Sequence, residues 1–269
     1  MTNEQPTWAS LVDDKYGWQW KGAMLVDPGT LQYELHSHRT SAGIARFIVK
    51  YIYGRQNQTR TVKNTIRRVV GELCPGQFGL NFGCGGTRLS ENVLNLDVSP
   101  NMAVDLLSSG SLQIPLKDSS LYLIVCQEVL EHIRHPDQLI SEFHKKLADG
   151  GQLVLQVPFI IGYHPGPEDL WRFTVEAFAM ILPEKNWKIE VKEITVGHGT
   201  SLHRILTEFT AVTFSFLGQK VYRLLKGIGA LVFFPLVLFD LLTPWLPERD
   251  RIPGGYIVVA RAIKVHSLD

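Results

Sequence analysis

The chain reads Asn81-Phe82-Gly83-Cys84-Gly85-Gly86 directly after a short apolar run that begins at Phe78. Glycines in a loop that follows a strand let the backbone approach a ligand where any side chain would collide. Such a loop is weak evidence alone, but Asp97 closes the next short apolar run. A carboxylate in that place accepts hydrogen bonds from the ribose hydroxyls of a nucleoside cofactor. The two strand ends together predict one binding crevice at an edge of a sheet.

Short apolar runs alternate with turns and helical segments from Phe78 onward, which is typical of a mostly parallel α/β sheet. Apolar residues at helical spacing predict helices, the last of which we expect to end in a glycine cap at Asp149-Gly150-Gly151. The predicted helices cover residues 41–53, 61–73 and 137–147, and the predicted strands cover residues 78–82, 93–97, 121–126, 152–157, 189–196 and 256–263.

The first two connections between strands are short. Ten residues, Thr87 to Leu96, separate the glycine loop from Asp97, and seven separate Asp97 from Asp105. A helical crossover usually needs at least about 10 to 12 residues in total. We therefore predict that both crossovers are reduced to turns, which leaves one face of the sheet thinly covered. The N-terminal helices, or an ordered arm over residues 1–35 that carries three tryptophans, would supply the missing cover.

The composition limits the function classes. The 269 residues, 45% of them hydrophobic, suffice for one full core with additions. The formal charge of +1 offers no basic footprint, so no nucleic-acid substrate is expected. Cys74, Cys84 and Cys126 form no C-x-x-C pair, which indicates reduced thiols and a cytoplasmic setting. The first six residues lack the basic and apolar regions of a signal peptide, so export is not expected.

An insertion of roughly fifty residues separates the strand that ends near Val196 from the last strand. Apolar residues between Leu202 and Ile228 recur near helical spacing and predict one long helix, and residues 227–239 hold no charge. A buried helical hairpin is the default interpretation, because Pro235 interrupts the run and a spanning helix needs about 20 apolar residues. The alternative is a peripheral membrane contact through residues 209–247, at the inner face of a membrane. It is suggested by basic residues before the run and aromatic residues suited to headgroup depth, namely Lys220, Arg223, Lys226, Phe233, Phe234 and Trp245.

The predicted organisation therefore has four parts. An N-terminal arm with helices covers residues 1–74, and a core covers residues 75–200. The hydrophobic helical insertion covers residues 201–252, and residues 253–269 supply the last strand of the core.

Two further segments complete a family pattern: Val129-Leu130-Glu131-His132 and Leu147-Ala148-Asp149-Gly150-Gly151. With the glycine loop and Asp97, they resemble class I S-adenosylmethionine-dependent methyltransferases of the group with a V-L-E-H segment and an L-K-P-G-G turn, over about residues 78–182. The resemblance implies an α/β Rossmann-like sheet, to which this chain adds the N-terminal helical extension, the reduced first crossovers and the insertion. It implies S-adenosyl-L-methionine as cofactor, bound by Asn81, Gly83, Cys84, Gly85, Asp97, Gln127, Glu128 and His132.

The chain departs from the family pattern at four places. Asn81 stands where an acid usually ends the first strand, and it can still bond the methionine ammonium but offers no charge. Thr87 displaces a third glycine, and Tyr122 stands where the family usually has Asp. The acid that often approaches the adenine is missing within residues 108–112. These departures concern cofactor affinity more than the fold.

Residues 157–174 resemble the P-F-x-x-x-Y-H-x-x-P-x-D-x-x-R-F-T stretch of methyltransferases often associated with bacterial glycan and secondary-metabolite pathways. This resemblance implies a small-molecule or glycan acceptor, lipid-linked if the insertion touches membrane, and favours O-methylation. His164 is the candidate general base, because an unperturbed imidazole pKa of about 6.5 suits neutral conditions. The alternative is that His164 only bonds the backbone of a proline-rich loop. The candidate substrate residues are Phe159, Tyr163, Asp169 and Arg172.

Other patterns carry less weight. Glu131, His132 and His135 have the composition of metal ligands but match no zinc motif, so no metal is expected. Tyr222 and Lys226 have the Y-x-x-x-K spacing of short-chain dehydrogenases, yet they lie on the insertion helix. Two other functions stay open: a catalytically silent Rossmann-like module at a membrane, and a nicotinamide-dependent oxidoreductase, although no G-x-G-x-x-G sequence is present.

Overall fold

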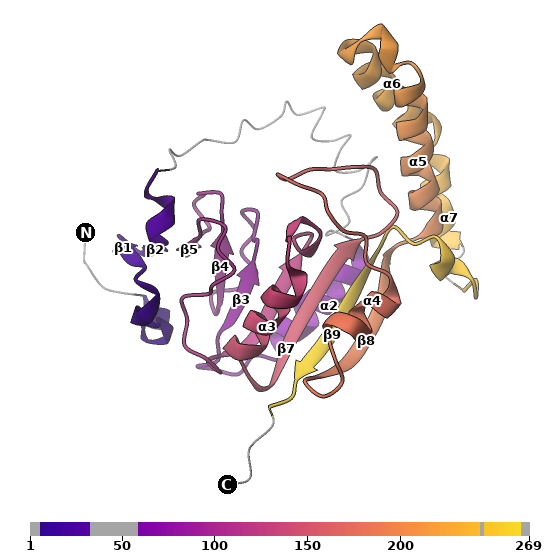
Figure 1. Cartoon of the computed structure of the whole chain (residues 1–269). Coiled ribbons are helices and arrows are strands. Elements are labelled where there is room, and N and C mark those ends of the chain that lie inside the picture. Colours follow the sequence, from indigo (N-terminus) through magenta and orange to yellow (C-terminus); the bar gives the residue numbers. More distant parts are fainter. Residues whose placement is uncertain (1–5, 33–58, 243–244, 265–269) are drawn as a thin grey trace.

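Figure 1 shows a computed structural model of the chain, which describes residues 6–32, 59–242 and 245–264. Nine strands in these residues form one sheet, in the spatial order β1-β2-β5-β4-β3-β6-β7-β9-β8. All six predicted strands are present, as β3, β4 and β6 to β9. The strands are β1 (Gln19–Lys21), β2 (Met24–Val26), β3 (Gly79–Phe82), β4 (Val93–Asp97), β5 (Leu106–Leu107), β6 (Leu121–Gln127), β7 (Leu147–Pro158), β8 (Trp187–Val196) and β9 (Gly255–Ala262).

The sheet is parallel from β2 to β7, and β9 runs antiparallel to both of its neighbours. Strand β3 lies between β4 and β6, so the chain order reverses there. In open α/β sheets, ligands bind outside the carboxyl ends of the strands at such a reversal. The mostly parallel α/β fold is thus confirmed, and the strand order places the expected binding site between the glycine loop and the end of β6.

Helices cover both faces of the sheet, since alternate residues of each strand point to opposite sides. On one face, α2 (Arg60–Gly71) buries Val62 and Val69 against the face of β6 that carries Leu123 and Val125. On the other, α3 (Pro136–Lys146) and α4 (Val175–Ile181) pack with Ile124 and Cys126 in the larger core. Helix α2 confirms the prediction for residues 61–73, while the predicted helix 41–53 lies outside the described residues.

The reduced crossovers are confirmed, because turns alone connect β3 to β4 and β4 to β5. The N-terminal arm joins the same sheet: β2 pairs in parallel with β5 and β1 pairs with β2. Trp8 is buried in the core on the α3 side, 5.2 Å from the ring of Trp20. Residues 6–32 of the arm are therefore ordered, as expected, and they extend the sheet as well as covering it.

The expected glycine cap of the third helix is wrong. Helix α3 ends at Lys146, and Leu147 is already extended because it pairs with Leu121 in the ladder between β6 and β7. The turn at Gly150, with φ of +72°, lies inside β7. Burial of Leu147 in the sheet thus ends the helix before the glycines are reached.

The insertion is a helical hairpin that projects beyond the sheet (Figure 1). The prediction of one long helix from Leu202 to Ile228 is wrong, because the chain reverses at Gly218, whose φ of +101° is open mainly to glycine. Asp240 fastens the returning arm to the start of the outgoing one, since its carboxylate accepts hydrogen bonds from Gly199 N at 2.8 Å and Thr200 N at 3.0 Å. The hairpin consists of α5 (His198–Thr213), the short turn η7 (Ser215–Leu217), α6 (Gln219–Val232) and α7 (Pro235–Leu242).

The hairpin prediction holds, but the expected burial of the hairpin does not. Residues Gln219–Leu242 form a helical segment of 24 residues that is long and apolar enough to cross a membrane by length and composition, with a hydropathy of 2.0 and only 11% of its most apolar stretch buried. Many large apolar side chains of the hairpin are exposed, among them Phe209, Val212, Phe216, Leu217, Leu224, Leu231, Val232, Leu241 and Leu242.

Candidate active site

The glycine loop follows β3 and turns sharply through residues of positive φ, at +73° for Gly83, +54° for Gly85 and +88° for Gly86. A Cβ atom on Gly83 would lie 2.3 Å from Val129 Cγ2, so the loop touches the segment that follows β6. A Cβ atom on Gly85 would meet nothing within 4 Å. The loop therefore offers bare backbone to open space beside the end of β6, as a bound nucleoside cofactor requires.

Asp97 and Asn81 hold this loop in place. Asp97 is 8% exposed, and its carboxylate accepts hydrogen bonds from Gly85 N at 2.7 Å and Ser99 N at 2.8 Å. Each carboxylate oxygen can accept a second bond, so the ribose role expected of Asp97 stays open to it. The Asn81 amide donates to Thr87 O at 3.0 Å and Asn95 Oδ1 at 3.1 Å. Both amide hydrogens are thus used within the fold, and the Asn81 oxygen is the atom left to receive an ammonium.

The side chain of Cys84 is buried, although its backbone is part of the glycine loop. This side chain packs among Val26, Val104 and Leu107. Burial raises the pKa of the Cys84 thiol to about 11. The thiol is therefore protonated at neutral pH, and cofactor contact by this residue is limited to its backbone.

Gln127 and Glu128 form a network at the ends of β6 and β7. Gln127 Nε2 donates to Gln156 Oε1 at 2.8 Å, and Gln156 Nε2 donates to Glu128 Oε1 at 3.0 Å. Glu128 has a positive φ of 54°, which is uncommon for a residue with a side chain and gathers at functional sites. Burial, together with the nearby Glu131 carboxylate, raises the pKa of Glu128 to about 8.

A polar cluster of Glu131, His132 and His164 lies next to this network. Glu131 is fully buried in η6 (Leu130–His132), and neither of its carboxylate oxygens has a hydrogen-bond partner among the residues that the structure describes. His132 Nε2 lies 3.6 Å and His164 Nε2 lies 3.7 Å from Glu131 Oε1. The two rings meet edge to face, with centroids 5.5 Å apart. Glu131 raises the pKa of His164 above its ordinary value, against the opposing effect of burial.

Backbone carbonyls fix the orientation of both rings. His132 Nδ1 bonds Glu168 O, and His164 Nδ1 lies 3.1 Å from Gly162 O and 3.2 Å from Asp169 Oδ2. The nearest neighbours of each Nδ1 are acceptors, while the donor Arg172 Nη2 lies farther from His164 Nδ1, at 3.4 Å. We therefore assign the hydrogen of each neutral ring to Nδ1. Each Nε2 then presents its lone pair to the Glu131 carboxylate.

The loop from Phe159 to Phe173 delivers His164 to this position. Leu170 N and Trp171 N donate to Glu131 O at 2.9 and 3.2 Å, which ties the loop to η6. Arg172 binds Asp169 through two hydrogen bonds of 2.5 and 2.7 Å, and it holds the pKa of Asp169 down at about 2. Asp169 in turn accepts from His164 N at 2.9 Å. Asp169 and Arg172 thus brace the loop around His164.

The other two candidate substrate residues are separated from the polar cluster. Tyr163 is 76% exposed, and Phe159 packs its ring 5.6 Å from that of Tyr256 beside the core. Their substrate roles, like the other roles assigned to site residues from sequence, stay predictions.

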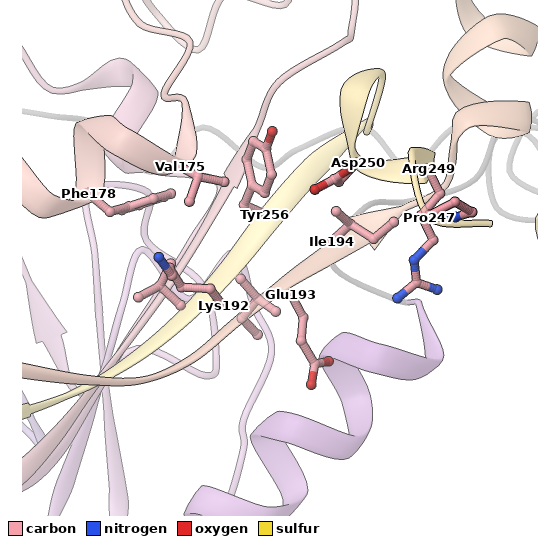
Figure 2. A pocket seen from close by; sticks show the side chains of 11 residues that line it. Val175, Phe178, Lys192, Glu193, Ile194, Pro247, Arg249, Asp250 and Tyr256 are labelled. Atoms are coloured by element: carbon pink, nitrogen blue, oxygen red, sulfur yellow. The ribbon is translucent and has the colours of Figure 1, made fainter. Parts of the chain in front are cut away.

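A separate cavity of about 330 Å³ lies where the hairpin returns to the sheet (Figure 2). Phe178 and Tyr256 line it, and Lys192, Glu193, Arg249 and Asp250 supply its charged groups. None of its lining residues belongs to the glycine loop or to the polar cluster.

Asp27 is a further candidate site residue, and the sequence pattern does not indicate it. The carboxylate of Asp27 accepts from Ser109 Oγ at 2.6 Å and Ser109 N at 3.2 Å, so the arm brings an acid to the segment where the family acid is missing. No sequence motif near Asp27 indicates this contact, because the pairing of β2 with β5 is what brings Asp27 to Ser109.

The residues present fit S-adenosylmethionine. Bare glycine backbone faces open space, and buried Asp97 with free acceptor capacity stands at the next strand end. Asp97 would hold the ribose, and the Asn81 oxygen would face the ammonium. When bound, the cofactor supplies an electrophilic methyl group.

Comparison with known proteins supports this assignment. Residues 79–155 match the family model of a methyltransferase domain, a family that uses S-adenosylmethionine. A search among curated protein sequences finds no match.

The chain also resembles solved structures that are distant in sequence. A phosphoethanolamine N-methyltransferase 2 of Haemonchus contortus with bound S-adenosyl-L-methionine is 15% identical, with a TM-score of 0.48 over 84% of this chain and 58% of that one. A putative methyltransferase of Haloferax volcanii, in complex with the Trm112 activator, is 14% identical, with a TM-score of 0.47 over 82% and 93%. The [4+2]-cyclase SpnF is 16% identical, with a TM-score of 0.46 over 75% and 81%.

The matched segment carries β3, the glycine loop, Asp97, β6 and the polar residues Glu131 and His132. The sheet order around it, with its reversal at β3 and the antiparallel strand β9, agrees with the expected fold. Residues 79–155 thus match a methyltransferase domain whose family uses S-adenosylmethionine, and the strand order agrees with the fold expected from the sequence.

Proposed function

We propose that the protein transfers the methyl group of S-adenosylmethionine to a hydroxyl of a small-molecule or glycan acceptor that is held at a membrane surface. The observation that carries the proposal is the contact between the glycine loop and the segment after β6. Gly83 lies against Val129, two residues before buried Glu131, so the cofactor loop and the polar cluster lie close together at the end of β6.

Methyl transfer requires an acceptor oxygen in line with the sulfonium at about 3 to 3.5 Å. The new oxygen–carbon bond forms as the carbon–sulfur bond breaks, and the electron pair of that bond stays on sulfur. The hydroxyl proton must leave as well. His164 Nε2 is the candidate base, since its Nδ1 is committed to Gly162 O and Nε2 is the lone-pair atom.

The exposed hairpin supports a membrane-held acceptor. Gly162, in the loop that carries His164, lies beside Glu208 of α5, because a Cβ atom there would be 3.7 Å from Glu208 Cγ. The outgoing helix α5 of the hairpin thus adjoins the loop that carries His164. Contiguous exposed apolar surface of this kind is typical of interaction sites with proteins or membranes.

Charge favours a membrane as the partner of the hairpin. Lys220 and Arg223 are exposed in the first turns of α6, close to Phe216 and Leu217 at the turn. Basic residues beside exposed aromatic and aliphatic side chains suit an anionic lipid surface. Free thiols at Cys74, Cys84 and Cys126 are consistent with the cytoplasmic face of that membrane.

Calorimetry with S-adenosylmethionine and S-adenosylhomocysteine tests the first step. We expect saturable binding of both, and an Asp97→Ala variant should bind at least about 10-fold more weakly, since it loses a charged hydrogen-bond acceptor. Transfer of a labelled methyl group to hydroxylated glycans, free and lipid-linked, then tests the reaction. Absence of saturable binding at millimolar cofactor would overturn the proposal.

The second candidate is a catalytically silent module at a membrane. It is favoured by one observation: both Asn81 amide hydrogens are consumed inside the fold, and the usual acid is absent. Cofactor binding without methyl transfer to any of these acceptor pools would support this candidate instead.

A further inference from the structure

The polar cluster contains a feature that methyl transfer alone does not explain. The ligand-capable atoms of Glu131, His132 and His164 all lie within 4.8 Å of one another. Glu131 is fully buried, and both of its carboxylate oxygens lack a hydrogen-bond partner among the described residues. A buried carboxylate without hydrogen bonds is costly, and buried charges in proteins are paired or coordinate metals.

The two histidines are prepared in the manner of metal ligands. Each directs Nδ1 to a backbone carbonyl, Glu168 O for His132 and Gly162 O for His164. A histidine that binds a metal almost always donates its other ring N–H to a carbonyl or carboxylate, which fixes the ring and its tautomer. Both Nε2 lone pairs then face the same carboxylate.

The distances favour a cation over a shared proton. The separations of 3.6 and 3.7 Å from Glu131 Oε1 to the two Nε2 atoms exceed hydrogen-bond length, so a proton on either ring leaves the carboxylate oxygens without a donor. Ligand atoms bound tetrahedrally at about 2.1 Å from an ion lie about 3.4 Å apart. The observed separations are within a few tenths of an ångström of that value.

We propose that Glu131, His132 and His164 bind a divalent first-row transition-metal cation. Two imidazole ligands disfavour magnesium and calcium, which prefer oxygen. Two histidines and one carboxylate also leave coordination positions open, as catalytic sites require.

The cation has a place in the reaction, and this part rests on the proposed function. An acceptor hydroxyl in an open position would be acidified by the ion and would lose its proton to water. Its oxygen would then bond to the methyl carbon as the carbon–sulfur bond breaks and leaves its electron pair on sulfur. His164 Nε2 is then a ligand. The role of general base applies to His164 only in the metal-free site.

Cobalt(II) absorption tests the binding directly, with the untagged full chain and cobalt chloride as the probe. We expect visible absorption bands that saturate at one equivalent. Glu131→Gln and His164→Gln should each weaken cobalt binding more than about 100-fold, since losing a group behind the ligands already costs about 10- to 100-fold. His135→Gln is the matched control, because this exposed histidine lies three residues after His132 and outside the cluster.

Two further measurements separate the outcomes. The double variant His36→Gln/His38→Gln, which removes another closely spaced histidine pair of the sequence, should bind cobalt normally. Circular dichroism should show that every variant keeps the helical content of the parent chain. Cobalt bands that persist in both Glu131→Gln and His164→Gln would overturn the site, as would their absence in the parent chain. Calorimetry with S-adenosylmethionine on the same preparations shows independently whether the proposed function stands.

Discussion

The sheet and the helical hairpin carry similar apolar side chains, but the sheet buries them and the hairpin exposes them. Phe143 of α3 is fully buried and meets Phe82 of β3 edge to face, whereas Phe216 at the turn of the hairpin is 78% exposed. Every described residue of β3 and β4 is buried, while most apolar side chains of α6 and α7 face outward. The hydrophobic effect thus explains the fold of the sheet, but it leaves the composition of the hairpin to be explained by a partner.

The largest expected difference between the two regions is in stability. Phe143→Ala should lower the free energy of unfolding by about 3–5 kcal/mol, because it empties a fully buried site. Phe216→Ala should change it by less than about 0.5 kcal/mol. Urea unfolding followed by circular dichroism measures both. Equal losses would show that the hairpin tip is buried in solution, and the comparison would fail.

Membrane binding should show the reverse dependence. The double variant Leu224→Glu/Leu231→Glu removes two exposed apolar side chains from α6, at 62% and 57% exposure. We expect vesicle binding to fall about 10- to 100-fold in flotation with anionic vesicles, since burying a leucine contributes about 1.5–3 kcal/mol when complete. Met180→Glu, which charges an exposed residue of α4, is the control. Unchanged flotation of the double variant would exclude α6 from the contact.

Sequence periodicity predicted the sheet because each core strand is decided by its own residues. Leu121 to Cys126 is an apolar run, and three of the five residues from Val93 to Asp97 are apolar; such runs are buried in parallel sheets. The pairing of β2 with β5 could not be predicted in this way. It joins short segments far apart in the chain, and neither has a strong pattern of its own.

The candidate site was predicted in part for the same reason. Glu131 and His132 are adjacent in the sequence, so their proximity is predictable, whereas the sequence pattern groups them with His135. His164 replaces His135 because bonds from Leu170 N and Trp171 N to Glu131 O fold a distant loop onto η6. Periodicity also could not predict that the hairpin is exposed, since buried helices and membrane-bound helices share the same apolar spacing.

The junction between the two regions depends on Asp240. Helix α5 starts at Gly197 without a side-chain cap of its own, and the Asp240 carboxylate of α7 takes that role by accepting from Gly199 N and Thr200 N. Asp240→Ala should cost about 1–2 kcal/mol, the usual value of a helix cap. Hydrogen exchange should accelerate at these two amides and along α7, and Asp240→Asn should recover part of the protection. Unchanged exchange in Asp240→Ala would show that packing alone fixes the hairpin.

The smallest expected effect concerns charge at the hairpin. A basic residue near an anionic membrane contributes about 1 kcal/mol, so Lys220→Ala and Arg223→Ala should each weaken binding to anionic vesicles about 5-fold. Lys188→Ala, on the exposed side of β8, should have no effect. The difference should vanish on neutral vesicles and shrink as salt is added, because screening acts over about 10 Å at 0.1 M ionic strength. Equal losses on neutral and anionic vesicles would mean that these side chains act through packing, and that apolar contact alone distinguishes the hairpin from the sheet.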